Sequence, residues 1–301
     1  MMNPSSSQPA TSGVLNLNKP TGVTSRNVVD QVARLVRKTK VGHAGTLDPL
    51  ATGVLVVCVG SATRLIEYVQ RMPKTYRTVV RLGATSDTLD ADGQIVEGEV
   101  RSIPSLDQVE QAVQAQVGSI LQRPPEYSAL KVAGKRAYDL ARAGVNVELA
   151  PRPVRVDRVA ILSYEWPRLE LEIDCGAGTY IRSIARDVGE SLGTGGLVEV
   201  LTRTAIGPFR LGEALDPRSL SAEALPGLLL SNSKAVSCLP SVKVTDQDAL
   251  NLARGRAIRV DDAGLVAGEL AVFTEEGSLV AIAEADPATG MLAPRRVLSH
   301  A

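Results

Sequence analysis

A strict alternation of apolar and acidic residues constrains the fold more than any other feature of this chain. Residues 169–175 read Leu-Glu-Leu-Glu-Ile-Asp-Cys, and this period of two is typical of a β-strand with one buried and one exposed face. The glycine-containing turn at 176–179 leads into a helix predicted for 180–192, which Gly193 ends. In the rest of the sequence, the predicted strands and helices follow one another in no regular order. The pattern therefore favours an α+β fold, with a mostly antiparallel mixed sheet flanked by helices, over a regular βαβ array.

Further elements are predicted from apolar runs and capping residues. The apolar run at 54–59 indicates a central strand, and the alternation at 76–82 indicates a strand whose other face is partly basic. Ser25 is predicted to cap a helix that follows a short N-terminal strand. Ser105 and Gln108 form a capping box ahead of another helix.

The chain of 301 residues is long enough for one large domain and one smaller domain. Residues 1–12 are rich in Ser and Pro, so we expect a disordered tail. Residues 13–238 are predicted to form the main domain. Beyond Leu239-Pro240, short apolar pairs are separated by turn residues, which predicts a small β-rich domain over 241–301.

Cysteine and histidine counts exclude several kinds of site. The three cysteines contain no C-x-x-C pair, which disfavours disulfides and a zinc cage, and only His43 and His300 are available to a metal. No apolar run is long enough to span a membrane and no signal peptide is visible, so we expect a cytoplasmic protein without membrane association. Catalysis would depend on carboxylates, tyrosines, lysines or arginines.

Charge is balanced over the whole chain, at 33 basic against 33 acidic residues, but it is unevenly distributed. Residues 19–81 contain eleven Lys or Arg against three acids, and residues 82–110 contain seven acids against Arg101 alone. One interpretation is a basic face that meets a polyanion. The alternative is the solvated face of a helix.

The loop at 43–55 is the densest unusual segment of the sequence. It reads His-Ala-Gly-Thr-Leu-Asp-Pro-Leu-Ala-Thr-Gly-Val-Leu. Asp48 therefore lies just before the buried strand predicted at 54–59. Loops of this kind position reactive groups on a rigid scaffold. The dipeptide Asp-Pro is also common in structural turns. From the residues alone, both a catalytic role for Asp48 and a structural turn therefore remain open.

Several spaced motifs resemble those of one protein family. The loop just described resembles the H-x-G-T-L-D-P-x-A-T-G-x-L signature of the TruB family, the bacterial tRNA pseudouridine 55 synthases. The segment at 17–25 resembles the family's L-D-K-P-x-G-x-T-S motif, with Asn18 where an acid is usual. Four more segments recur in the family's order, at 74–77, 87–93, 127–131 and 178–182. The resemblance runs from Gly13 to about Ser299.

This resemblance implies a fold, a reaction and a substrate. The fold is the pseudouridine synthase fold with a PUA-like RNA-binding domain at the C-terminus. The reaction breaks the glycosidic bond between the nitrogen of a uridine base and its ribose, and joins the ribose to carbon 5 of the same base. This is an isomerisation that requires no cofactor and no metal. The target base must be flipped out of its stack before it can react.

The resemblance also implies roles for individual residues. Asp48 holds the intermediate as nucleophile or charge stabiliser, and Arg182 is its paired arginine, which favours the charged carboxylate. Tyr76 stacks on the flipped base and lies where it could help remove the carbon 5 proton. The remaining predicted substrate-binding residues are His43, Tyr180, Leu201 and Lys19. From the residues alone, each of these has an ordinary structural alternative, such as core packing for Tyr76.

The predicted partner is the T-arm stem-loop of tRNA, because RNA loops offer splayed bases that a pocket can capture. We expect a monomer that works without guide RNA. The helix-bearing segment between Gly93 and Arg123 resembles the stand-alone bacterial type rather than relatives that act on ribosomal RNA in guide-RNA particles. A tRNA folding chaperone, whose catalytic residues are dispensable to its main role, is the alternative from another functional class.

Overall fold

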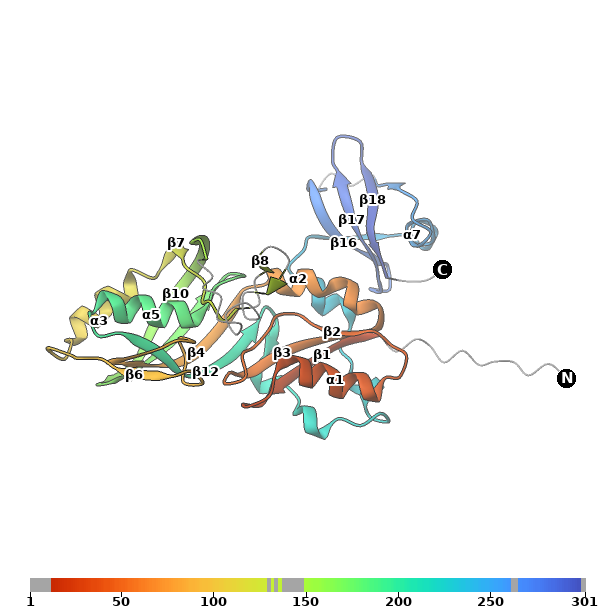
Figure 1. The fold of residues 1–301 in the computed structure, drawn as a ribbon. Helices are drawn as coiled ribbons and strands as arrows, with labels where there is room; N and C mark the ends of the chain where they lie inside the picture. Colours follow the sequence, from red (N-terminus) through yellow and green to blue (C-terminus); the bar gives the residue numbers. More distant parts are fainter. Residues whose placement is uncertain (1–11, 129–130, 133–134, 137–148, 261–264, 299–301) are drawn as a thin grey trace.

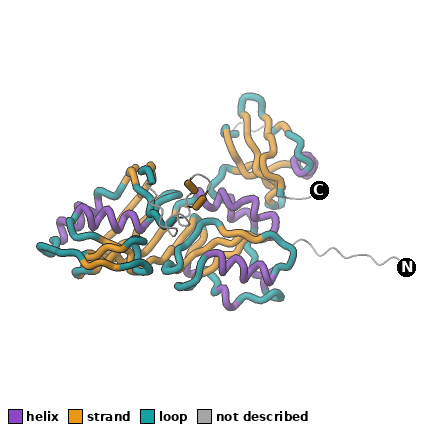
Figure 2. Tube along the Cα trace, viewed as in Figure 1, coloured by secondary structure: helices purple, strands orange, loops and turns teal. Residues whose placement is uncertain are grey.

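The computed structural model describes residues 12–128, 131–132, 135–136, 149–260 and 265–298. Within these residues the chain forms a nine-stranded sheet, a five-stranded sheet and two short hairpins. Figure 1 shows the larger sheet with helices packed along it, and the smaller sheet above one end of it. Figure 2 shows that loops connect most of the strands, so the structure is α+β rather than a regular βαβ array.

The larger sheet has the spatial order β1-β3-β12-β4-β11-β10-β7, with β2 and β13 paired to β3 and β12. Of its described strand pairs, β3 with β12 is parallel and the rest are antiparallel, which confirms the mostly antiparallel sheet. Its strands are β1 (Gly13–Lys19), β2 (Val41–His43), β3 (Thr52–Val59), β4 (Lys74–Leu82), β7 (Gly118–Gln122), β10 (Arg152–Glu165), β11 (Arg168–Cys175), β12 (Gly196–Ile206) and β13 (Phe209–Arg210).

Short helices and hairpins connect these strands. The α-helices are α1 (Ser25–Leu35), α2 (Ile66–Arg71), α3 (Leu106–Gln114), α5 (Ile181–Ser191), α6 (Leu225–Leu228) and α7 (Asp246–Ala253). The 3₁₀ turns are η1 (Gly60–Leu65), η2 (Leu211–Glu213), η3 (Pro217–Ser219) and η4 (Asn232–Val236). The hairpins pair β5 (Ala84–Ser86) with β6 (Ile95–Glu97), and β8 (Lys131–Val132) with β9 (Lys135–Arg136).

The helix caps follow the sequence pattern with one exception. Ser105 and Gln108 form the predicted capping box of α3. The prediction that Ser25 caps α1 is wrong, because Thr24 is the N-cap and exchanges capping-box hydrogen bonds with Asn27. Ser25 is instead the first helical residue, and its buried hydroxyl contacts Leu47 in the loop before β3.

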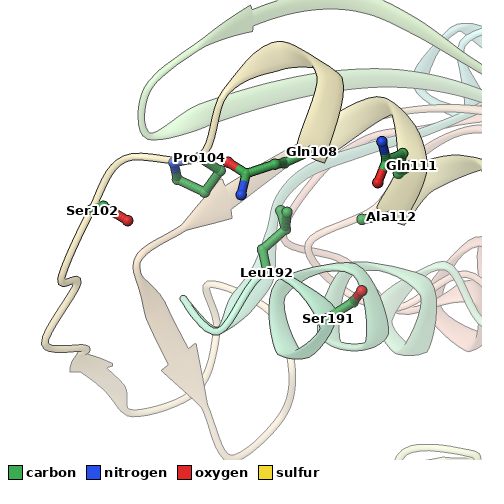
Figure 3. Close-up of a pocket in the computed structure, with 7 residues that line it drawn as sticks. All are labelled: Ser102, Pro104, Gln108, Gln111, Ala112, Ser191 and Leu192. Atoms are coloured by element: carbon green, nitrogen blue, oxygen red, sulfur yellow. The ribbon is translucent and has the colours of Figure 1, made fainter.

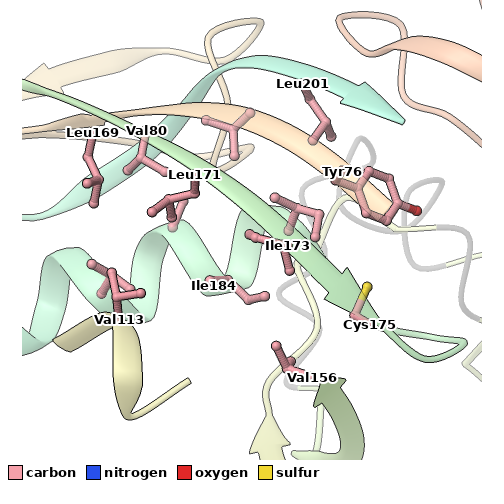
Figure 4. Close-up of a cluster of buried hydrophobic side chains, with 14 of the residues drawn as sticks. Tyr76, Val80, Val113, Val156, Leu169, Leu171, Ile173, Cys175, Ile184 and Leu201 are labelled. Carbon is pink, nitrogen blue, oxygen red and sulfur yellow. The ribbon is translucent and has the colours of Figure 1, made fainter. Parts of the chain in front are cut away.

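One apolar cluster joins the inner face of β4, β11 and β12 to α3 and α5 (Figure 4). The predicted strand at 169–175 is β11, and its four apolar side chains are all buried. Truncation of such a side chain, for example Leu171→Ala, typically costs about 2–5 kcal/mol in unfolding free energy. The cluster extends to Leu47 and Tyr76, so the core of the sheet directly supports the loop that carries Asp48.

The smaller sheet has the order β14-β16-β17-β18-β15. Its strands are β14 (Ser241–Val244), β15 (Ile258–Arg259), β16 (Gly268–Thr274), β17 (Leu279–Asp286) and β18 (Met291–Val297). Helix α7 packs on its apolar core and was not anticipated from the sequence. The domain boundaries remain a prediction, and residues 1–11 of the expected tail lie outside the described residues.

The two sheets meet at α2. Glu269 of β16 accepts a hydrogen bond from the Tyr68 hydroxyl at 3.0 Å and pairs with Arg71 at 2.7 Å. Burial, followed by the Glu269 contact, raises the pKa of Tyr68 to about 12. Beneath these polar contacts, Ile282 and Leu298 pack in the same apolar cluster as Tyr68. The second sheet is therefore docked by apolar as well as polar contacts.

No helix in the described part of the chain is long and apolar enough to cross a membrane.

Candidate active site

The loop that carries Asp48 connects β2 to β3 and is fastened on one side by the segment before α1. The Ser25 hydroxyl accepts a hydrogen bond from the Leu47 amide at 2.8 Å and donates to the Leu47 carbonyl at 3.1 Å. The Gly22 amide donates to the Pro49 carbonyl at 2.8 Å. The residues on both sides of Asp48 are therefore held by the 17–25 motif.

Lys19 also holds the same loop. Its Nζ donates to the carbonyls of Pro20, Val23 and Pro49 at 2.9, 2.7 and 3.2 Å, so all three ammonium protons have an acceptor. Burial lowers the pKa of Lys19 to about 8, and the nearby charge of Asp48 opposes that shift. The side chain is 0% exposed. These contacts position the loop, and the predicted contact of Lys19 with substrate stays a prediction.

Arg203 of β12 holds the loop from the opposite side. Its Nε donates to the Val54 carbonyl at 2.8 Å, and its two terminal nitrogens donate to the carbonyls of Thr46 and Gly45 at 3.4 and 3.1 Å. Gly53 lies directly beside Arg203 in the sheet, with φ of +102° and no room for a side chain. Sequence reasoning missed Arg203, because a buried arginine in a strand has no local signature.

Asp48 and Arg182 form the predicted pair. The Arg182 Nε lies 3.0 Å from Asp48 Oδ2, and the Arg182 side chain is 5% exposed whereas that of Asp48 is 35% exposed. The Nε makes no aligned hydrogen bond, so the contact is one of charge rather than a directional bond. The arrangement presents a carboxylate to solvent with a buried cation behind it.

The two terminal nitrogens of the Arg182 guanidinium also have partners. Its terminal nitrogens donate to the carbonyls of Thr88 at 2.7 Å and Tyr127 at 2.9 Å, and one lies 3.4 Å from a carboxylate oxygen of Asp90. Arg182 is in the first turn of α5, the helix that begins after the 176–179 turn. These contacts hold its guanidinium in one orientation behind Asp48.

Asp90 is a site residue that sequence reasoning did not single out. Its side chain is 5% exposed and accepts hydrogen bonds from the Thr88 hydroxyl at 2.6 Å and the Asp92 amide at 3.1 Å. Burial raises the pKa of Asp90, while Thr88 and Arg182 act in the opposite direction. Asp90 lies in the 87–93 segment, and that family-like motif was the available signal.

Tyr76 and Leu201 form an apolar wall next to the loop. Both are buried and pack in the same cluster as Leu47. In Figure 4 the Tyr76 hydroxyl points away from the aliphatic side chains of Ile173 and Leu171. Burial raises the pKa of Tyr76, and the positive charge of Arg203 opposes this. The tyrosine thus has one apolar face in the core and a polar end near the charged groups.

Tyr180 and His43 are both partly exposed. Tyr180 is the N-cap residue of α5, and its backbone is hydrogen-bonded in both directions by the side chain of Gln122. The Arg152 guanidinium lies 5.2 Å from the centre of its ring, an arrangement that stabilises the ring position. His43 is the last residue of β2, at the entrance to the Asp48 loop.

A pocket in the described residues lies away from Asp48. It has a volume of about 300 Å³ and is placed between α3 and α5 (Figure 3). Its lining contains no charged residue: Ser102, Pro104, Gln108, Gln111, Ala112, Ser191 and Leu192. Among the described residues no three His, Cys, Asp or Glu side chains are grouped to hold a metal ion.

This geometry offers a defined set of chemical functions. Asp48 is an exposed carboxylate beside a buried guanidinium, which suits a nucleophile or a stabiliser of positive charge. The buried ring of Tyr76 and the side chain of Leu201 suit a planar apolar ligand such as a nucleobase. The site thus combines a carboxylate, a fixed cation and an apolar wall.

Comparison with known proteins identifies the family of the chain. The description "TruB family pseudouridylate synthase (N terminal domain)" matches residues 33–181, and "Pseudouridine synthase II TruB, C-terminal" matches residues 240–298. The chain is 41% identical to tRNA pseudouridine synthase B of Dehalococcoides mccartyi, over 90% of this chain and 91% of the relative. It is 40% identical to the protein of that name in Chromohalobacter salexigens, over 96% and 95%.

A solved structure has the same fold. The crystal structure of a Cbf5-Nop10-Gar1 complex contains a chain with a TM-score of 0.76 and 26% identity, covering 100% of this chain and 92% of that chain. The match therefore spans both sheets. Together with the sequence relatives, which share about two fifths of their residues over most of the length, it leads to one conclusion: the chain belongs to the TruB family of pseudouridine synthases.

Proposed function

We propose that this enzyme converts uridine 55 in the T loop of tRNA to pseudouridine, and that it does so without guide RNA. The observation that carries the proposal is the Asp48–Arg182 pair, in which the carboxylate is exposed and the guanidinium is buried. The names of the sequence relatives support tRNA as the substrate. Such a substrate would be met in the cytoplasm, where we expect the protein to act as a monomer.

The proposed reaction conserves all atoms of the uridine. The bond between N1 of the base and C1′ of the ribose breaks, a new bond joins C1′ to C5, the proton on C5 leaves, and N1 takes up a proton. The carboxylate of Asp48 stabilises the intermediate while the detached base rotates. Its position is compatible with attack on the base, attack on the ribose, or assistance of elimination through a glycal.

Arg182 holds the Asp48 carboxylate in place. Because its guanidinium is anchored on the carbonyls of Thr88 and Tyr127, it need not reorganise during the reaction, and preorganised charges contribute most to catalysis of this kind. The buried Asp90 balances part of the guanidinium charge. We propose that Asp90 thereby tunes how strongly Arg182 holds Asp48.

The target uridine must leave its stack to reach Asp48. Flipping costs a few kcal/mol, and stacking on an aromatic side chain offsets this by about 1–3 kcal/mol per base. We assign the stacking surface to Tyr76, with Leu201 and Tyr180 completing the pocket. His43, at the loop entrance, is assigned to the displaced neighbouring nucleotides.

The second sheet is proposed to be the RNA-binding domain of the enzyme. Its docking through Glu269, Ile282 and Leu298 supports this role, because a fixed second contact surface helps to orient a long substrate. Residues 241–301 are assigned to this domain and residues 13–238 to the catalytic domain.

The test is direct mapping of the product. The purified full-length protein is incubated with a T-arm hairpin transcript, without guide RNA or cofactor, and pseudouridine is located by mass spectrometry. The matched control is the same hairpin with cytidine at the target position. We expect pseudouridine at position 55 alone; an unmodified hairpin, or modification only when a guide RNA is added, would overturn the proposal.

A further inference from the structure

We propose that the groove between α3 and the outer edge of β10 binds an extended, basic segment of a partner protein, which adds to β10 as a further strand. The groove lies at the end of the larger sheet that carries β10 and β7 (Figure 1). Its lining contains none of the residues assigned to the reaction. The inference therefore goes beyond the proposed function and does not depend on it.

The first observation is a strand edge that is only partly paired. On one side, β10 pairs with β11 from Val156 to Glu165, whereas on the other side β7 pairs with it only from Arg152 to Val156. Within the described part of the chain, residues 157–165 therefore have no neighbouring strand on the outer side. The amides and carbonyls along such an edge can form hydrogen bonds with an added strand.

The second observation is a groove beside this edge, with a volume of about 650 Å³. Val113 of α3 and Val159 and Ile161 of β10 form its apolar part. Where β7 pairs with β10, Val154 and Val156 are buried. Val159 and Ile161 pack against the same core but are only partly buried. An added strand would cover them, as β7 covers the neighbouring part of β10.

The third observation is the charge of the groove. Its charged lining residues are Asp107 and Glu110 of α3, and both are exposed. In the part of the chain that the structure describes, neither carboxylate has an ion-pair or hydrogen-bond partner. Unpaired carboxylates beside an apolar surface are complementary to a segment that carries both apolar residues and lysine or arginine.

This charge decides between the possible occupants. Nucleic acid and an anionic membrane would be repelled by the carboxylates. A second copy of this chain, paired edge to edge about a two-fold axis, would bring the acidic rims of both copies to one interface, where like charges oppose pairing. Residues 1–11 contain no lysine or arginine. A basic segment of another protein matches the carboxylates, the apolar groove and the strand edge together.

The irregularity of β10 limits the length of the added strand. The register shifts between Val156 and Arg158 and again between Ile161 and Ser163. Bulges of this kind bend an edge and restrict its pairing. The regular stretch between them, Arg158 to Ile161, can accept a short strand of about four residues. We therefore expect a short linear segment rather than a whole sheet as the partner element.

The first experiment measures binding of a fluorescently labelled probe peptide to the full-length protein by anisotropy. The probe reads Val-Thr-Lys-Thr-Val-Thr-Lys with blocked ends, so its valines and lysines lie on one face of a strand and can meet the groove together. A control peptide with proline in place of each threonine has the same charge but cannot pair as a strand. We expect saturable binding of the probe and at least about tenfold weaker binding of the control.

Protein variants locate the contact. Asp107→Lys combined with Glu110→Lys reverses the charge of the groove, and should weaken probe binding by at least about tenfold. The matched control, Glu275→Lys combined with Glu276→Lys, makes the same change of charge in the turn between β16 and β17. Its affinity for the probe should stay within about twofold of wild type. Thermal unfolding of both variants verifies that they are folded.

Hydrogen exchange of the wild-type protein tests the added strand without any variant. If the probe pairs with β10, the amides of residues 157–163 that face the outer edge gain hydrogen bonds, and their exchange should slow when the probe is bound. The proline peptide should give no such protection. The same amides should exchange quickly in the free protein.

The inference is overturned if the probe does not bind saturably, if the groove variant binds it as tightly as the control variant, or if bound probe leaves the exchange of residues 157–163 unchanged. A concentration-dependent dimer of the free protein that the groove variant abolishes would assign the edge to a second copy, and would also overturn it. Because no RNA is used, these results are independent of whether the proposed reaction takes place.

Discussion

The guanidinium of Arg182 lies 3.0 Å from the carboxylate of Asp48, and the two side chains differ sevenfold in exposure, at 5% and 35%. A cation that is buried and anchored on backbone carbonyls cannot follow its partner into solvent. The carboxylate, which lies at the surface of the site, can still meet a substrate. The pair therefore combines a fixed charge with an accessible reactive group.

Replacement of Arg182 by lysine should damage catalysis far more than binding. A lysine keeps the positive charge, but its single ammonium cannot contact Asp48, Asp90 and the two carbonyls together. We expect the single-turnover rate to fall by about 10²- to 10³-fold, the usual cost of losing a preorganised electrostatic group. Hairpin affinity should stay within about threefold of wild type.

Arg186→Lys is a suitable control for this prediction. Arg186 is in the same helix and pairs with Asp187 and Glu190 rather than with Asp48. Its rate should remain close to wild type. If Arg182→Lys were as active as this control, the guanidinium would have no special role in the site.

The buried Lys19 predicts a pH dependence of stability. Its pKa is lowered from 10.5 to about 8 by burial. Below pH 8 the amine is protonated in both the folded and the unfolded chain, and the cost of burying the charge is fully present. Between about pH 8 and 10.5 only the unfolded chain keeps the proton, so this group makes the free energy of unfolding rise with pH.

The measurement is urea unfolding of wild type and Lys19→Met from pH 7 to pH 10.5. The wild-type value should rise relative to Lys19→Met across this window, by up to about 3 kcal/mol. The exposed Lys243→Met variant reports the pH dependence of the rest of the protein. A difference between wild type and Lys19→Met that is constant with pH would show that Lys19 does not titrate there.

Gly53 is predicted to tolerate no side chain. A Cβ at this position would lie 2.2 Å from the Arg203 carbonyl oxygen, and its φ of +102° is strained for any other residue. Gly53→Ala should lower the free energy of unfolding by more than about 2 kcal/mol and displace the Asp48 loop. Gly212→Ala, where a Cβ meets nothing within 4 Å, should change stability by less than about 0.5 kcal/mol. Equal stability of the two variants in thermal unfolding would contradict this prediction.

Local patterns in the sequence were sufficient for the main elements of the fold. The alternation at 169–175, the apolar run at 54–59 and the Ser105 capping box depend on neighbouring residues alone, and each is found as an element of the expected type. These signals arise from side-chain periodicity and from the need to satisfy the first amides of a helix. They do not indicate which strands pair with one another across the sheet.

The contacts that build the site are not of this local kind. Asp48 and Asp90 lie in loops, Arg182 begins a helix and Arg203 is inside a strand; only tertiary packing brings them together. From sequence, Arg182 and Arg203 look like any surface arginine. The resemblance to a family identified the first of these and offered no signal for the second.

Lys19 and Ser25 show the same limit in another form. Both were recognised as members of a motif, but the motif did not reveal that their side chains hold the Asp48 loop, and the cap predicted for Ser25 belongs to Thr24. Both side chains are buried and hydrogen-bond the Asp48 loop. A motif identifies residues that belong together, whereas the tertiary fold decides which groups each side chain contacts.

The central claim is that the Asp48 carboxylate is required for the reaction and not for RNA binding. It is tested most directly by single-turnover pseudouridine formation with Asp48→Asn, measured alongside hairpin affinity. The account predicts a rate loss of at least about 10³-fold with affinity within about threefold of wild type. Product formation by Asp48→Asn at the wild-type rate would contradict it.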